Sequence, residues 1–168
     1  MPEKKTLVRA RKDKREGKAP STQAGEFVRE EMEHIREGKH GARSTKQAIA
    51  IGLSKARRAG VDLPPPEKGE ASDKTRRSAR RTYEAGQKGR KHVSRTRARA
   101  VTKALKREPH SAASKTALAR QAKTAARRRG PSERSAAARK AVKTKGAAGR
   151  SAAARKAART RARKSAGR

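Results

Sequence analysis

The fold of the first part of this chain is decided by residues 21–60, which read STQAGEFVREEMEHIREGKHGARSTKQAIAIGLSKARRAG. Two stretches within it have apolar residues at three- and four-residue spacing, the pattern of one face of an amphipathic helix. Between them lies a short break, residues 38–43, with two glycines. Such a connection lets two neighbouring helices pack antiparallel, so the stretch predicts a helical hairpin.

Capping patterns set the expected ends of these helices. Ser21 is the expected N-cap of the first helix, which runs through Glu37 and ends at Gly38. The second helix is expected to begin at Ser44, because a Ser with Gln three residues later has the spacing of a capping box, and to end at Gly60.

Outside the hairpin, charge dominates the composition. The 168 residues carry 50 Lys and Arg against 15 Asp and Glu, a formal net charge of +35. Leu, Ile, Val and Phe together number only 15. A highly charged chain tends to be disordered when these residues make up less than roughly 20% of it, and their share here is far smaller. The expected fold class is therefore all-α, with a small N-terminal hairpin followed by a largely disordered basic tail that contains latent helices.

The run Pro64-Pro65-Pro66 marks the expected domain boundary, because neither a helix interior nor a central strand tolerates it. Residues 1–63 have a net charge of +7 and residues 64–168 one of +28. We expect an N-terminal module (1–63), a Pro-rich linker (64–70), basic helix-prone segments (71–130) and an Ala/Lys/Arg-rich repeat tail (131–168).

The helix-prone segments share one design, in which a Ser cap precedes about twelve to sixteen residues rich in Ala, Lys and Arg. They span 72–86, 94–109, 114–130, 132–146 and 151–167. The sequence RSAAARKA occurs at 134–141, within the fourth segment, and again at 150–157, which overlaps the fifth. Repulsion between the cations predicts that these segments stay largely unstructured until phosphates neutralise them.

Several classes of site and protein are not expected. The chain has no Cys, so disulfides and thiolate metal sites are excluded. No two of its four histidines have the i,i+4 spacing of a metalloprotease helix, and the glutamates of residues 26–37 are expected to form a solvated acidic face. We expect no catalytic residue, metal or cofactor, hence no enzyme. No apolar run is long enough for a membrane span or a signal peptide, so a cytoplasmic protein is expected.

A chain of this charge is expected to bind a polyanion, because contacts with phosphates release condensed counterions. Duplex DNA is the expected partner, and the protein is expected in the nucleoid. RNA is the alternative, although only Phe27 and Tyr83 could stack on bases. The small core of the N-terminal module also favours stabilisation by a homodimer or by nucleic acid. The expected nucleic-acid-binding residues are Arg43, Lys46, Lys55, Arg57, Arg58, Arg127, Arg128, Arg129, Arg139, Lys140, Arg155, Lys156, Arg159, Arg161, Arg163 and Lys164.

Residues 36–60, REGKHGARSTKQAIAIGLSKARRAG, resemble a family of small basic bacterial proteins, some of them labelled DNA-binding or plasmid-stabilisation proteins. The resemblance covers the N-terminal module and, more loosely, the chain up to Gly130. It implies a bacterial setting and supplies no catalytic residue. The last forty residues resemble in composition the tails of linker histones and of bacterial histone-like proteins, but residues 1–63 lack the strand pattern of a winged helix.

Overall fold

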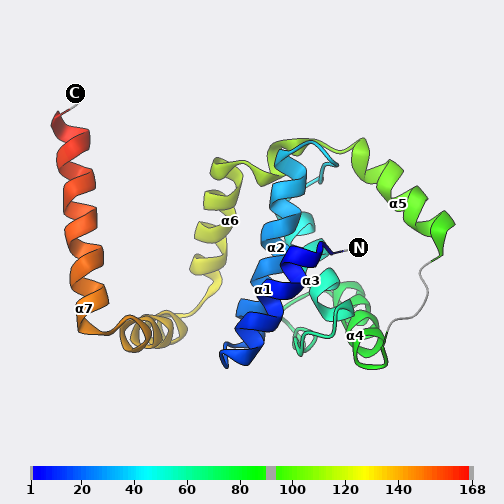
Figure 1. Ribbon diagram of the computed structural model, residues 1–168, viewed down its shortest axis with the longest axis horizontal. Helices are drawn as coiled ribbons and strands as arrows, with labels where there is room; N and C mark the ends of the chain where they lie inside the picture. The colour runs from blue at the N-terminus through cyan, green and yellow to red at the C-terminus, as the bar shows by residue number, and fades with distance from the viewer. Residues whose placement is uncertain (1, 90–93, 167–168) are drawn as a thin grey trace. The chain divides into compact units, whose positions relative to one another are not determined.

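A computed structural model describes residues 2–89 and 94–166, except for the side chain of Lys164. The described residues form helices and contain no β-strand, which confirms the all-α prediction (Figure 1). The elements are α1 (Lys4–Arg15), α2 (Pro20–Arg36), α3 (Thr45–Arg58), α4 (Asp73–Gln87), α5 (Arg95–Lys106), the 3₁₀ helix η1 (His110–Ala113), α6 (Lys115–Arg128) and α7 (Pro131–Ala166).

The predicted hairpin of α2 and α3 is present, and it is the centre of the first compact unit, residues 1–121. One apolar cluster on it contains Met32, Ile35 and Ala48, and a second contains Phe27 and Ala56. The two helices cross closely: a Cβ built on Gly52 would lie 2.6 Å from Cα of Val28. The hairpin therefore depends on a glycine at that crossing.

The structure confirms one of the two predicted helix starts. At α3, the backbone N–H of Gln47 donates to Oγ of Ser44 over 3.2 Å, and Oε1 of Gln47 accepts from the N–H of Arg43 over 2.8 Å. The predicted start of α2 is wrong, because its N-cap is Ala19 and not Ser21. Pro20 occupies the first turn, where its fixed φ suits a helix and its missing N–H costs nothing.

Helix α1 was not predicted from the sequence. It packs against α2 and contributes Leu7 and Ala10 to the cluster around Phe27. Its other buried side chains are those of Thr6 and Asp13. Seven of its twelve residues are Lys or Arg, so the apolar stripe is too narrow to stand out, and packing on α2 is what favours the helix.

The first unit extends well beyond the expected boundary at Pro64–Pro66. Helix α4 packs on α3 so closely that a Cβ on Gly86 would overlap the carbonyl oxygen of Arg57. Farther along the chain, Ala112 and Ala113 of η1 are buried in the cluster around Ile35. Short Ala-rich segments after the prolines thus complete the small core of the hairpin.

A buried hydrogen bond holds η1 on the hairpin: the hydroxyl of Thr45 donates to the carbonyl of Ala112 over 2.7 Å. We expect Thr45→Val to lower the free energy of unfolding by about 1–3 kcal/mol, because the buried carbonyl would lose its donor. Urea denaturation of the full chain followed by circular dichroism measures this. The exposed Thr22 is the control, since Thr22→Val should change stability by less than about 0.5 kcal/mol; equal effects of the two substitutions would contradict the prediction.

The second compact unit, residues 122–168, consists of the end of α6 and of α7. The prediction of a largely disordered tail is wrong, because residues Pro131–Ala166 are helical apart from a break at Gly146, where φ is 64° and ψ is 178°. Ser151 does not cap a helix, since it lies inside α7. The high helix propensity of Ala, Arg and Lys outweighs the repulsion that we expected to prevail.

Candidate functional site

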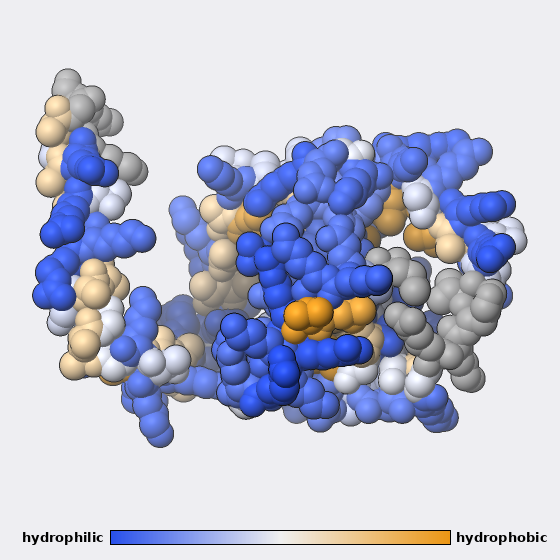
Figure 2. All heavy atoms as spheres, in the orientation of Figure 1, coloured by the Kyte–Doolittle hydropathy of each residue, from blue (hydrophilic) through white to orange (hydrophobic). Residues whose placement is uncertain are grey.

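The described side chains of the basic residues in α7 are all exposed. The helix contains 12 Lys and Arg and one acidic residue, Glu133. At about 100° per residue, cations at irregular spacing point to every side of the helix. Blue, hydrophilic side chains accordingly alternate with paler ones along it in Figure 2. Among the predicted binding residues, those exposed on α7 are Arg139, Lys140, Arg155, Lys156, Arg159, Arg161 and Arg163, while the side chain of Lys164 lies outside the described ones.

Three further predicted residues, Arg127, Arg128 and Arg129, are exposed at the end of α6 and just after it. They follow one another in the chain and precede Pro131, where α7 begins. Lys and Arg in this position extend the cationic surface of the second unit beyond α7. Nearly every residue that the sequence assigned to binding in this unit is therefore accessible to a polyanion.

On α3 and its preceding loop, the structure separates the predicted residues into two groups. Arg43, Lys46 and Arg58 are exposed. The prediction that Arg57 binds nucleic acid has to be corrected, because this side chain is buried. Its guanidinium donates to the carbonyls of Leu63 and Pro64 over 3.0 and 3.1 Å. Burial also lowers the pKa of the Arg57 guanidinium. This side chain holds the start of the proline run against α3 and is not available to a phosphate.

The prediction that Lys55 binds nucleic acid has to be corrected as well. Its ammonium lies 2.6 Å from Oε2 of Glu31 and 3.6 Å from Oε1 of Glu30. Both glutamates are buried, Glu31 completely. If this cation turned outward to a phosphate, two buried carboxylates would lose their common ion-pair partner, which is strongly destabilising. Lys55 therefore belongs to the interior of the fold, and the sequence missed this because helical spacing does not reveal which helix lies opposite.

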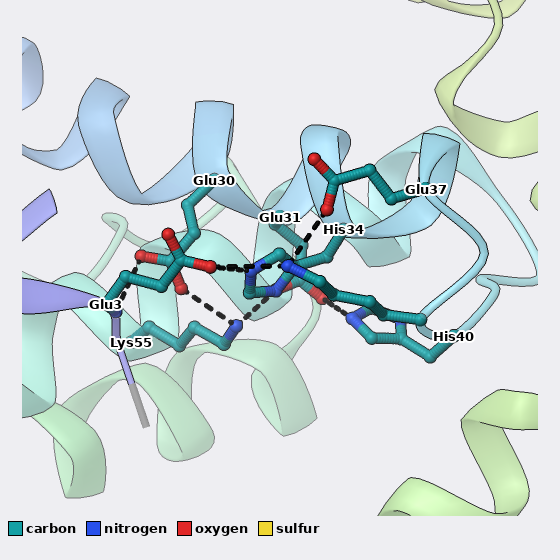
Figure 3. A network of polar contacts seen from close by, with 8 residues as sticks. Glu3, Glu30, Glu31, His34, Glu37, His40 and Lys55 are labelled. Atoms are coloured by element: carbon teal, nitrogen blue, oxygen red, sulfur yellow. Dashed lines mark hydrogen bonds and ion pairs between the residues drawn. The ribbon is translucent and has the colours of Figure 1, made fainter. Parts of the chain in front are cut away.

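These contacts are part of a larger charge cluster, partly buried and partly exposed, which Figure 3 shows between α2, α3, the N-terminal residues and the loop 37–44. Nε2 of His34 lies 2.8 Å from Oε1 of Glu3, and the backbone N–H of Glu3 donates to Glu30 over 3.1 Å. Nε2 of His40 lies 3.4 Å from Oε1 of Glu31. The hydrogen bond with His34 is the main cause that lowers the pKa of Glu3. The cluster is made of Glu3, Glu30, Glu31, His34, Glu37, Lys39, His40 and Lys55.

The prediction that the glutamates of residues 26–37 form a solvated acidic face is thus wrong for two of the five, Glu30 and Glu31. Glu33 and Glu37 are exposed, as predicted. The cluster also brings together residues that the sequence analysis set aside. The spacing of Glu31 and His34, i and i+3, puts both on one face of α2, and the loop returns His40 to the same place. The helical spacing of Glu31 and His34 can be seen in the sequence. The position of His40 beside them depends on the conformation of the loop.

Sequence reasoning also left out exposed cations of the first unit. They lie on α1, on α4 and on α5, a helix with no buried residue. The predicted binding residues covered only the stretches 43–58 and 127–164, although Lys and Arg are at least as dense on α1. The exposed ones are Lys4, Lys5, Arg11, Lys12, Lys14, Arg15, Lys74, Arg77, Arg80, Arg81, Arg95, Arg97, Arg99, Lys103 and Lys106.

The two non-histidine aromatic residues have structural contacts. Phe27 is 1% exposed and fills the cluster between α1, α2 and α3. The hydroxyl of Tyr83 donates to Asp62 over 2.6 Å, and this hydrogen bond is the main cause that raises the pKa of Tyr83. Phe27 cannot stack on a base without unfolding the core, and Tyr83 is partly buried.

Among the described residues, no helix combines the length and the apolar character needed to cross a membrane. A comparison with curated proteins finds no match, and a comparison with solved structures finds none either. Residues 14–68, which include all of α2 and α3, match the model of a protein family of unknown function, DUF6496.

Proposed function

We propose that this chain is a non-enzymatic, nucleoid-associated protein of histone-like type that binds duplex DNA without sequence specificity. The observation that carries the proposal is α7, with 12 Lys and Arg, one Glu and no described side chain that is buried. Lys and Arg neutralise phosphates and release counterions without a particular arrangement, so exposed number matters more than position. Such a protein is expected in the cytoplasm of a bacterium, on its nucleoid.

The geometry favours non-specific binding. Reading of bases usually requires a rigid element that delivers several side chains into a groove. The best candidate was α3 with Lys46, Lys55, Arg57 and Arg58, but Lys55 and Arg57 have interior partners. Two exposed cations remain on that helix, which is few for a recognition helix. A contribution to plasmid maintenance would then come from coating DNA, not from recognising a sequence.

Two cationic units in one chain also favour condensation or bridging of DNA. Residues 122–168 contain 17 of the 50 Lys and Arg, and the first unit has exposed cations on α1, α4 and α5. Each unit has enough exposed positive charge to contact a duplex by itself. We expect the protein to draw separate duplex segments together, and a homodimer through the first unit would add to this effect.

RNA, including ribosomal RNA, is the alternative ligand. Proteins that bind single-stranded RNA usually stack bases on aromatic side chains. Phe27 is in the core and Tyr83 is tied to Asp62, so such stacking is disfavoured. Electrostatic contacts to structured RNA need no aromatic residue, and therefore the two ligands have to be distinguished by experiment.

Competition binding with the full chain tests the proposal. We expect duplex DNA to displace a labelled duplex much better than structured RNA does at equal phosphate concentration, with an affinity that is the same for unrelated DNA sequences. A variant in which residues 147–166 are shuffled should retain its affinity, because composition is unchanged. A variant in which the five Arg and two Lys of that stretch are replaced by Gln should lose affinity. Equal displacement by the two nucleic acids, or a preference for RNA, would favour the alternative. Loss of affinity on shuffling would contradict non-specific binding.

A further inference from the structure

We propose that Glu31, His34 and His40 form a binding site for a divalent transition-metal ion, with Zn²⁺ the best match. Two imidazoles and one carboxylate are a donor set that Zn²⁺ commonly uses, with a further position open to water. The inference is independent of the proposed DNA binding, because no residue of the trio belongs to the exposed cationic surface. It replaces our expectation that the chain has no metal site.

The three side chains converge from two segments. Glu31 and His34 lie one turn apart on α2, and His40 comes from the loop 37–44 (Figure 3). One ligand atom from each residue lies within 4.8 Å of the other two. Ligand atoms around a tetrahedral zinc ion, with bonds of about 2.1 Å, are roughly 3.4 Å apart. The donor atoms therefore have to approach one another by no more than about 1.4 Å to hold the ion.

Neighbouring groups already orient both histidines. Nδ1 of His40 lies 3.1 Å from the carbonyl of Gly41, a contact in which only an N–H can donate. Nε2 of His40 is then left with its lone pair, on the side of Glu31. In the same way the carboxylate of Glu3 lies 2.8 Å from Nε2 of His34, which would leave Nδ1 of His34 to bind the ion. A carbonyl or carboxylate behind a histidine is typical of metal sites, because it fixes the tautomer and the ring orientation.

Glu31 has the strongest need for a further cation. Its side chain is fully buried, and neither of its carboxylate oxygens accepts a hydrogen bond of normal geometry from the described residues. Oε2 has an ion pair with Lys55 at 2.6 Å, whereas Oε1 has only the imidazole of His40 at 3.4 Å. Buried carboxylates are costly unless they are paired and hydrogen-bonded. A metal ion between Oε1 and the two imidazoles would supply the missing partner.

Local charge also makes this place exceptional in the chain. The cluster contains four carboxylates and two lysines, while the whole sequence has a net charge of +35. A small cation is repelled by most of the surface and attracted here. With no Cys anywhere in the sequence, thiolates cannot compete for the ion.

A bound ion would join the loop 37–44 to α2 and, through Glu3 and His34, the N-terminal residues to the same helix. Small cores without disulfides commonly gain stability from such a metal staple. The core of the first unit is small in this sense, since its largest fully buried side chains are those of Phe27, Ile35 and Glu31. The site is therefore expected to stabilise the fold of the first unit.

Titration of the full chain with Zn²⁺ and Co²⁺ tests the inference. We expect one ion per chain, a Co²⁺ absorption spectrum that shows imidazole ligation, and a thermal midpoint that rises on addition of Zn²⁺. His40→Gln should weaken Zn²⁺ binding at least about 10-fold. His110→Gln is the matched control and should bind as the wild type does, because His110 is exposed and outside the trio; His92 lies outside the described residues.

His34→Gln is the second variant and should have the same effect as His40→Gln. Circular dichroism establishes whether each variant remains helical. Should both variants lose their helices, the stoichiometry and the Co²⁺ spectrum of the wild type still decide the matter. Absence of imidazole ligation in the wild type would overturn the inference. Binding that His110→Gln weakens as much as His40→Gln does would also overturn it.

Discussion

Removal of residues 122–168 is expected to lower the affinity for duplex DNA at least about 100-fold at near-physiological salt. This unit has 17 Lys and Arg and one acidic residue in 47 residues. The described cations in it are exposed, so all of them are accessible to phosphates, although one duplex can contact only those on the side that faces it. The truncated chain, residues 1–121, keeps the compact first unit and its own exposed cations, and should retain weak binding.

The salt dependence of binding provides the decisive measurement. For each phosphate contacted, the logarithm of the affinity falls by about 0.9 per decade of salt. If half of the contacts come from residues 122–168, truncation should reduce the slope by about half. A chain of full length in which the Lys and Arg of this unit are replaced by Gln controls for length, and should behave as the truncated chain does. An unchanged slope in both would show that the DNA contacts lie in the first unit.

The part of the fold that the sequence predicted is the part that local signals specify. The periodic apolar residues of 24–35 and 48–56 predicted the hairpin, and Ser44 with Gln47 predicted the start of α3. Ser72, Ser94 and Ser114 likewise accept hydrogen bonds from backbone N–H groups three residues later, as expected of helix caps. Caps and periodicity act within one or two turns, so the sequence suffices to find them.

What the sequence could not predict depends on contacts between distant residues. The burial of Ala112 and Ala113 against the hairpin is invisible in a stretch that contains no large apolar residue. The same applies to Lys55, whose partners Glu30 and Glu31 lie on the opposite helix. The binding residues predicted from the sequence therefore include exposed cations together with cations, such as Lys55, that have partners in the interior.

The metal site shows the same limit in another form. Glu31 and His34 have helical spacing, but His40 joins them only because Gly38, with φ of 74°, ends α2 and turns the chain back. The N–H of Lys39 then donates to the carbonyl of His34 over 3.0 Å and fixes the turn. Sequence spacing can predict metal ligands that lie on one helix. It cannot predict a ligand such as His40, which comes close to that helix only because the chain turns back.

Gly52→Ala is expected to destabilise the hairpin by roughly 2–3 kcal/mol, the upper range for overpacking. The added Cβ would lie 2.6 Å from Cα of Val28 and 3.0 Å from its backbone nitrogen. Backbone atoms of a helix cannot move aside as the end of a flexible side chain can, so α2 and α3 would have to separate. Separation would open both apolar clusters, because α2 contributes Ile35 to one and Phe27 to the other.

Gly25→Ala is the matched control for the effect of Ala itself. Gly25 also lies within a helix, α2, but a Cβ there would have no atom within 4 Å. Since Ala is favoured over Gly inside a helix, this substitution should raise the free energy of unfolding by about 0.5–1 kcal/mol. Urea denaturation of the full chain, monitored by circular dichroism, measures both variants. The two substitutions should change the free energy of unfolding in opposite directions, because Gly52 faces the backbone of Val28 and Gly25 faces no other atom within 4 Å. A stabilising effect of Gly52→Ala would show that the helices are not in close contact at Val28.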